Sequence, residues 1–209
     1  MLKEIYEQPK TINDTISPRI KDNDIVIEEL NMSDEEIQEI TKIHIVACGS
    51  AYHTGVTAKY VIEGLARIPV EVDVASEFRY RDPILQKGNM VIVISQSGET
   101  ADTLAALRES KEKGFKVLGI VNVVGSSIAR EADSVMYTWA GPEIAVATTK
   151  AYSAQLTALY MLAMKFAKVR GTIDQEKFQS MLTDLRCLPD QIELLLGPVS
   201  YTHLRAHET

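Results

Sequence analysis

The sequence predicts a three-layer α/β fold, in which a doubly wound parallel sheet is covered by helices on both faces. Runs of β-branched and other apolar residues at 42–47, 91–94 and 115–121 are typical of strands buried on both faces. Segments with helical periodicity separate these runs at intervals that suit right-handed βαβ crossovers. In such sheets ligands bind at the carboxyl ends of the strands, near the point where the strand order reverses.

Length and composition fit one soluble domain. A chain of 209 residues can bury one sizeable core, and 45% hydrophobic with 24% charged residues is ordinary for a globular protein. A net charge of -7 without a basic patch argues against nucleic acid as the main partner. The longest apolar run is too short to span a membrane. Few cysteines and no signal peptide indicate a cytoplasmic protein, and Cys48 and Cys187 have no metal-ligand spacing.

Helical periodicity and capping signals predict the first elements. Apolar residues recur at helical spacing between Ile5 and Ile16, with Pro9 at a first turn or a kink. Ser33 followed by Glu36 is a capping box, which predicts a helix from residue 34 to about residue 41. The secondary structure of the short segment 25–30 is left unassigned, because its pattern fits neither a helix nor a strand clearly.

Alternating strands and helices follow. The predicted strands are 42–47, 70–75, 91–94, 115–121 and 134–139. The predicted helices are 51–65, 101–114, 148–169, 174–188 and 190–196, and residues 122–131 are predicted to form a turn that leads into a further short helix. The alternation in V-E-V-D-V-A places the second strand nearer an edge of the sheet, and Pro189 separates the last two helices. The polar stretch 76–85 is assigned no element.

A polar loop after the strand at 91–94 is the main candidate site. Ser95, Gln96, Ser97 and Thr100 surround Gly98 and lead into a helix. Unpaired N–H groups and the helix dipole favour an anion there, and the hydroxyls and the amide suit a phosphate and a polyol. The loop has neither the spacing nor the lysine of a Walker motif. Alternatively, Thr100 is only a helix N-cap.

A second loop at a strand end joins this prediction. Cys48, Gly49 and Ser50 follow the strand at 42–47, so the two loops share one crevice if the two strands are neighbours. Of the nearby histidines, His44 lies within a strand and is interpreted as a core residue. His53 lies in the first turn of a predicted helix, and the sequence leaves open whether its side chain approaches the site.

Five sequence blocks, taken in this order, resemble the isomerase part of glucosamine-6-phosphate synthases, which is built from sugar isomerase (SIS) domains. The blocks are A-C-G-S-A-Y-H-T-G (47–55), A-S-E-F-R-Y-R (75–81), S-Q-S-G-E-T-A-D-T (95–103), N-V-V-G-S-S (122–127) and A-G-P-E-I-A-V-A-T-T-K-A-Y (140–152). The resemblance covers residues 2–196 and implies a five-stranded, flavodoxin-like parallel sheet. The organisation expected from it is an N-terminal helical segment packing on the SIS domain at 1–41, the SIS domain at 42–197 and a tail unlike the family, with His203 and His207, at 198–209.

The resemblance also implies the substrate-binding residues. They are Ser95, Gln96, Ser97 and Thr100 in the phosphate and sugar loop, and Ser50, Ala51, Val146 and Thr148 beside the sugar. Ala51 stands where many members have serine, so that only its backbone N–H can donate. Thr148 replaces a common serine and keeps the hydroxyl with fewer rotamers.

The implied parent activity is that of an aminotransferase that makes glucosamine 6-phosphate from fructose 6-phosphate and glutamine. Its glutaminase domain and second SIS domain, with a catalytic glutamate, histidine and lysine, have no counterpart in these residues. We therefore expect a homodimer-forming unit that binds fructose 6-phosphate or glucosamine 6-phosphate, with no catalytic residue, metal or cofactor of its own and no turnover. Because residues 146–164 are apolar and the second SIS domain is missing, we also expect an exposed apolar surface and self-association.

Two other functions remain open at this point. One is an SIS deglycase of sugar-amine phosphates. The other is a sugar-phosphate-sensing module, although such regulators carry a helix-turn-helix with a basic face, and residues 1–41 show none.

Overall fold

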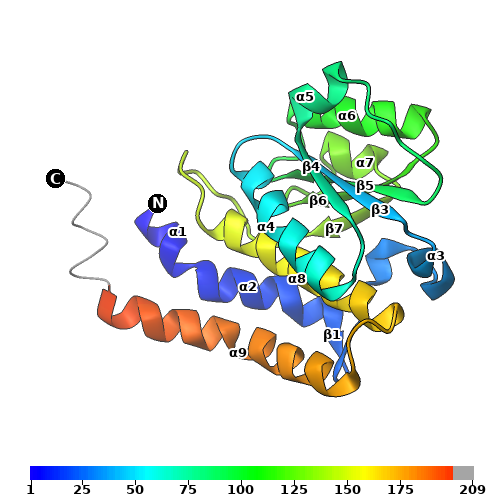
Figure 1. The fold of residues 1–209 in the computed structure, drawn as a ribbon. Helices are drawn as coiled ribbons and strands as arrows, with labels where there is room; N and C mark the ends of the chain where they lie inside the picture. Colours follow the sequence, from blue (N-terminus) through cyan, green and yellow to red (C-terminus); the bar gives the residue numbers. More distant parts are fainter. Residues whose placement is uncertain (200–209) are drawn as a thin grey trace.

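The computed structural model describes the backbone of residues 1–199 and the side chains of residues 1–197, and it confirms the predicted fold. A five-stranded parallel sheet in the order β4-β3-β5-β6-β7 has helices on both faces (Figure 1). Its strands are β3 (Lys42–Ala47), β4 (Val70–Val74), β5 (Asn89–Ser95), β6 (Lys116–Val121) and β7 (Ser134–Tyr137). Of the predicted tail at 198–209, residues 198 and 199 belong to the backbone of the last helix, and the rest, with His203 and His207, lies outside the described residues.

The strand order reverses between β3 and β5, which are direct neighbours. Ala47, the last residue of β3, pairs with Val74 of β4 on one side and with Ile94 of β5 on the other. The carboxyl ends of these strands are therefore level, and the loops that follow β3 and β5 open at the same edge. The condition for a shared crevice, that these two strands are neighbours, is therefore met, and the predicted position of β4 near an edge of the sheet is confirmed.

Two groups of helices cover the sheet. One face carries α4 (Ser50–Leu65) and α8 (Lys150–Val169), and the other carries α5 (Ala75–Tyr80), α6 (Ala101–Glu112) and α7 (Ser127–Glu131) (Figure 1). The remaining elements are α1 (Leu2–Tyr6), α2 (Gln8–Ile16), η1 (Ser17–Arg19), β1 (Ile20–Lys21), β2 (Asp24–Ile25), η2 (Glu28–Leu30), α3 (Asp34–Gln38) and α9 (Gln175–Val199). The polar stretch after β4, to which the sequence assigned no element, begins with helix α5.

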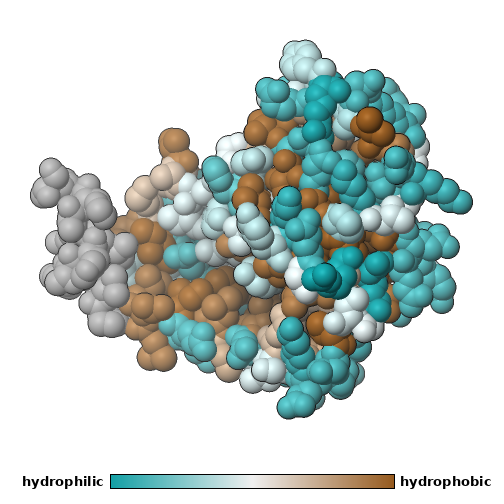
Figure 2. Space-filling view, viewed as in Figure 1, coloured by the Kyte–Doolittle hydropathy of each residue, from teal (hydrophilic) through white to brown (hydrophobic). Residues whose placement is uncertain are grey.

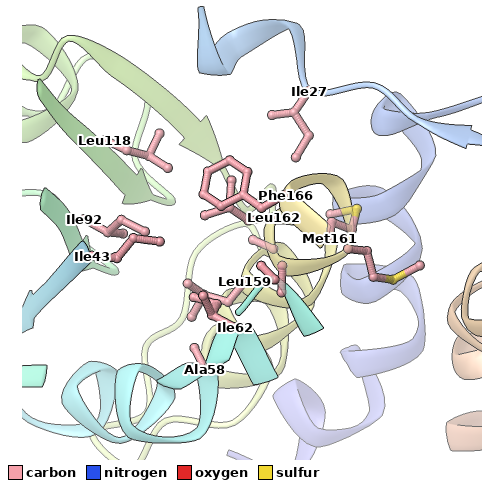
Figure 3. Packing of buried hydrophobic residues seen from close by; sticks show 14 of the residues in the cluster. Ile27, Ile43, Ala58, Ile62, Ile92, Leu118, Leu159, Met161, Leu162 and Phe166 are labelled. Carbon is pink, nitrogen blue, oxygen red and sulfur yellow. The ribbon is translucent and has the colours of Figure 1, made fainter. Parts of the chain in front are cut away.

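The larger core lies between the sheet and α8. Side chains of β3, β5 and β6 point toward side chains of α8 and α4 in a close-packed cluster (Figure 3). The labelled residues are Ile27, Ile43, Ala58, Ile62, Ile92, Leu118, Leu159, Met161, Leu162 and Phe166. Burial of a side chain of this size stabilises the fold by roughly 1.5–3 kcal/mol, so this layer fixes α8 against the sheet.

The N-terminal segment is attached to this body through α2 and Arg19. Helix α2, with Pro9 in its first turn, packs against α8 and α9. The fully buried Arg19 guanidinium donates to the carbonyls of Thr15 (2.8 Å) and Tyr137 (2.9 Å), the second of which belongs to β7. Glu29 balances its charge at 2.8 Å. A buried charge with these partners holds the segment to the edge of the sheet.

The structure corrects the expected exposure of residues 146–164. Helix α8 is central rather than superficial, because α2, α4 and α9 pack around it and most of its side chains are buried. An apolar surface does remain in a groove of about 500 Å³ between α2, α8 and α9, beside the apolar side chains that gather along α9 (Figure 2). None of the helices in the described part of the chain is long and apolar enough to cross a membrane.

The structure also corrects the predicted break at Pro189. Helix α9 runs without interruption through this proline. A proline in a helix interior costs about 3 kcal/mol, because it removes one hydrogen bond and crowds the preceding turn. Apolar side chains of α9 that are buried against the body, including Phe178 and Leu182, offset this cost. The capping box at Ser33 and Glu36 is confirmed, although its helix ends at Gln38.

Candidate functional site

The loops after β3 and β5 and the segment before α8 line one cavity of about 310 Å³. All eight residues that were expected to bind the substrate lie around it: Ser50, Ala51, Ser95, Gln96, Ser97, Thr100, Val146 and Thr148. Cys48 and Gly49, which belong to the second predicted loop, also line the cavity, and the lining is completed by residues that were not predicted: Ile94, Glu143, Ala145 and Gln155. The cavity lies at the reversal of strand order, where open α/β sheets bind ligands.

Hydroxyl groups organise the loop after β5. The Ser95 hydroxyl accepts from the Gly98 N–H at 3.0 Å and lies 2.9 Å from the Thr100 hydroxyl. Because one proton serves the bond between Ser95 and Thr100, the pair keeps one proton to donate elsewhere. Ser97 Oγ accepts from the Glu99 N–H at 3.2 Å and also keeps its own proton. The loop therefore offers two hydroxyl protons in addition to its backbone N–H groups.

Thr100 occupies the N-cap position of α6 without capping it. Among the described residues its side chain makes no cap hydrogen bond, since its hydroxyl bonds Ser95 instead. The first N–H groups of an α-helix have no partner within the helix. The positive end of α6 is therefore left to a ligand, which favours an anion at the cavity wall. The alternative interpretation of Thr100 as a hydrogen-bonding cap is wrong.

Gly98 lets this loop approach the loop between β6 and α7. Its φ is +67°, and a Cβ built on it would lie 2.0 Å from Ser126 Oγ. The Ile128 N–H donates to the Gly98 carbonyl at 3.0 Å, and the Ser127 N–H donates to Glu99 Oε1 at 2.7 Å. Hydrogen bonds from Ser127 lower the pKa of Glu99. The Glu99 carboxylate is thus committed to the start of α7 and does not line the cavity.

A glycine also sets the geometry of the loop after β3. Gly49 has φ +59° and ψ -137°, a conformation that residues with a Cβ avoid, and α4 begins immediately after it at Ser50. The exposed Ser50 and the half-buried Ala51 then present the first turn of α4 to the cavity. His53, one turn further on, is exposed and is not among the lining residues.

Glu143 caps α8 from inside the cavity. Its carboxylate accepts from the Thr148 hydroxyl at 2.7 Å, from the Thr149 N–H at 2.8 Å and from the Ala151 N–H at 3.3 Å. These bonds hold residues 148 and 149 in an N-terminal turn, so α8 begins at Lys150 and not at Thr148 as predicted. A carboxylate already neutralises this helix end, which leaves α4 and α6 as the helix starts whose positive ends face the cavity.

Three further side chains in or near the cavity have positions that the sequence did not indicate. Gln155 reaches the cavity from the second turn of α8 and is only 4% exposed. No local signal distinguishes it, because its role depends on which face of α8 meets the cavity. Val146 lines the rim, but its side chain is fully exposed. The Lys150 ammonium lies outside the lining and pairs with Glu7 at 2.6 Å.

One cluster in the described part of the chain has metal-ligand chemistry, and it lies away from this cavity. His44, Glu71 and Asp73 on β3 and β4 offer ligand atoms within 4.8 Å of one another. However, Lys42 binds Glu71, and Arg81 binds both carboxylates. A cation would have to displace these side chains, so the cluster is better described as an ion-pair network.

Comparison with known proteins connects the fold and the cavity to a family. Residues 36–165 match the SIS domain. The glutamine–fructose-6-phosphate aminotransferase of Clostridium tetani is 58% identical over 197 residues, which is 94% of this chain and 32% of that protein. The corresponding enzyme of Mycobacterium leprae is 50% identical over 203 residues, 96% of this chain and 32% of that protein.

Solved structures agree with this relationship. The C-terminal domain of glucosamine-fructose-6-phosphate aminotransferase from Francisella tularensis superposes with a TM-score of 0.85 at 41% identity, over 90% of this chain and 53% of that chain. Glucosamine-6-phosphate deaminase from Thermotoga maritima has a TM-score of 0.70 at 23% identity, over 98% and 58%, which shows the fold alone. The chain spans about a third of the length of the curated relatives that it matches. The chain belongs to the SIS domain family.

Proposed function

We propose that the chain binds fructose 6-phosphate, as the sugar-phosphate-binding SIS unit of a glutamine–fructose-6-phosphate aminotransferase. The observation that carries this proposal is the cavity in which the hydroxyl-rich loop and the free start of α6 meet the start of α4. Kinship with the aminotransferases, at 58% identity to one of them, supports the choice of sugar.

The phosphate belongs at the loop after β5. Ser97, Thr100 and the first N–H groups of α6 supply donors, and the dipole of α6 favours the negative charge. The sugar extends toward Ser50, the Ala51 N–H, Val146 and Thr148. Because Thr148 already donates its proton to Glu143, its hydroxyl oxygen acts as an acceptor for a sugar hydroxyl.

The same cavity argues against turnover by this chain alone. Isomerising a ketose phosphate requires a base over C1 and C2 of the open sugar. The serine, threonine and glutamine side chains of the lining are not bases near neutral pH. Glu143 is the carboxylate in the described lining, and donor groups of Thr148, Thr149 and Ala151 at the start of α8 engage it.

Calorimetry with fructose, fructose 6-phosphate and inorganic phosphate tests the binding proposal. We expect the phosphorylated sugar to bind more tightly than fructose. We also expect Ser97→Ala to weaken its binding by roughly 1–3 kcal/mol, the cost of leaving a charged acceptor unmatched. Thr57→Ala, which removes an exposed hydroxyl of α4 outside the lining, is the control. Equal affinity for fructose and its phosphate would refute the anion site.

Product assays test the activity proposal and the alternatives. We expect no glucosamine 6-phosphate from fructose 6-phosphate, with or without glutamine or ammonium. Turnover that disappears in Glu143→Gln would show that Glu143 is a base. Release of ammonia from glucosamine 6-phosphate would favour the deglycase instead. The proposed homodimer is measured by light scattering, where a monomer at high concentration would contradict it.

A further inference from the structure

We propose that Glu4, on the N-terminal helix, is a positioning residue that holds the 143–148 wall of the sugar-phosphate cavity in its binding geometry. The inference rests on the proposed function for the ligand, but its structural part stands on contacts within the chain. Glu4 is far from the wall in sequence and does not line the cavity.

The Glu4 carboxylate binds the backbone in the middle of this wall. Its Oε1 accepts from the Ile144 N–H at 2.7 Å and from the Ala145 N–H at 3.1 Å. The residue is only 7% exposed. Hydrogen bonds from Ile144, the terminal amine and Ala145 lower the pKa of Glu4 to about 2, so the carboxylate is the accepting form at physiological pH. Ala145 and Val146, at and beside the bound amides, line the cavity.

The wall has little else to hold its middle. The side chain of Ile144 is 89% exposed and that of Val146 is fully exposed, so apolar burial does not anchor this part of the wall. Among the described residues, side-chain hydrogen bonds fix the two ends of the segment. Asn122 donates to the Gly141 carbonyl at 2.8 Å before the wall, and Glu143 binds the start of α8 after it. Glu4 supplies the bonds between these ends.

Neighbouring residues keep Glu4 in place. Glu7 accepts from the Lys150 ammonium at 2.6 Å, and Gln8 Oε1 accepts from the Ser153 hydroxyl at 2.6 Å. Positions 4, 7 and 8 share one face of a helical turn, so all three side chains meet the wall and the start of α8 together. The N-terminal segment therefore acts as a clamp on the sugar side of the cavity, while the phosphate loop is braced separately by the loop between β6 and α7.

The test uses three variants of the whole chain. Glu4→Met keeps a similar volume and removes the acceptor. Glu4→Gln is the rescue variant, because both amides bind one oxygen and an amide carbonyl can supply it. Glu28→Met is the matched control, since Glu28 belongs to the same N-terminal segment, pairs only with Lys21 among the described ion pairs and is 73% exposed.

Hydrogen exchange and calorimetry are the two measurements. In Glu4→Met we expect exchange in residues 142–149 to be at least tenfold faster, with unchanged protection of β5 and β6. We expect at least fivefold weaker binding of fructose 6-phosphate, with the affinity for inorganic phosphate within twofold of the parent chain. Glu4→Gln should restore most of both effects, and Glu28→Met should show neither.

Each outcome decides the inference. Unchanged exchange in residues 142–149 of Glu4→Met overturns it, whatever the ligand affinity. Equal loss of inorganic phosphate binding also overturns it, because the effect would then not be specific to the sugar side. If the parent chain fails to prefer fructose 6-phosphate over fructose, the proposed function fails, while the exchange measurement still decides the role of Glu4. If Glu4→Met also loses protection in β5 and β6, the variant is unfolding as a whole, and Glu4→Gln is compared with the parent chain instead. Faster exchange of residues 142–149 in a folded Glu4→Gln chain would then contradict the proposed role of the Glu4 oxygen.

Discussion

Replacing Gly98 by alanine tests whether the loop after β5, the proposed phosphate loop, depends on close contact with the loop between β6 and α7. Two separate penalties act at this position. The φ of +67° lies in the left-handed region, which costs a residue with a Cβ about 1–2 kcal/mol. The new Cβ would also lie 2.0 Å from Ser126 Oγ and 2.5 Å from Ser126 Cβ, so rotation of the hydroxyl alone does not relieve the clash.

The chain offers a control for each penalty. Gly114 has φ +81°, and a Cβ there meets nothing within 4 Å among the described atoms, so Gly114→Ala measures the backbone term alone. Overpacking typically adds about 1–3 kcal/mol, which brings Gly98→Ala to roughly 2–5 kcal/mol. Ser126→Gly removes both clashing atoms. By itself it should change stability by only a few tenths of a kcal/mol, because Ser126 Oγ is buried without a partner in the described structure and makes no cap bond.

Urea unfolding followed by circular dichroism measures these differences. We expect Gly98→Ala to be about 1–3 kcal/mol less stable than Gly114→Ala, and Ser126→Gly to restore that difference in the double variant. Binding of fructose 6-phosphate should weaken in Gly98→Ala and recover in the same double variant. A Gly98→Ala chain as stable as Gly114→Ala, or a double variant without recovery, would refute the close-contact explanation.

Two further predictions concern buried polar groups. Thr100→Val should cost about 0.5–1.5 kcal/mol in urea unfolding, because it removes the hydrogen bond to the buried Ser95; an unchanged midpoint would contradict this. Burial, with the charge of Lys42, lowers the pKa of His44, so the unfolded chain takes up a proton first as the pH falls below about 6.5. The unfolding free energy should therefore decrease from pH 7 to pH 5.5, and His44→Gln should show a smaller decrease; equal pH dependence would exclude His44 as the cause.

Patterns within short segments were sufficient to predict the helices and strands that depend mainly on interactions between residues close together in sequence. The strand–loop–helix units at Ser50 and Ser95 follow from β-branched runs that end in glycine and hydroxyl residues. The capping box at Ser33 and Glu36 depends on two side chains three residues apart, so it could be predicted without knowing the fold. Parallel strands have their carboxyl ends at one edge, which is why Ser50 and the residues of the loop after β5 could be expected around one cavity. Ala51, Val146 and Thr148 were expected there only from the resemblance to the family.

Packing between segments far apart in sequence decided the features that the sequence did not predict or predicted wrongly. Pro189 was predicted to separate two helices, but burial of α9 side chains such as Phe178 offsets one lost hydrogen bond. The apolar residues of α8 indicated an exposed surface, whereas α2 and α9 of the same chain cover most of it. The hydroxyl of Thr100 could bond either its own helix or Ser95, and only the folded loop places Ser95 within 2.9 Å.

The sequence by itself thus determined the sheet, most of the helices that cover it and the polar residues of the loop after β5, because period, propensity and spacing are properties of short segments. The tertiary structure decided what surrounds them. Glu4 and Gln155 reach the cavity region from helices far from the phosphate loop in sequence, and nothing in their neighbouring residues marks them. Their positions follow from how α1 and α2 pack beside α8 and how α8 packs on the sheet, and that packing is the sum of many weak contacts between segments far apart in sequence.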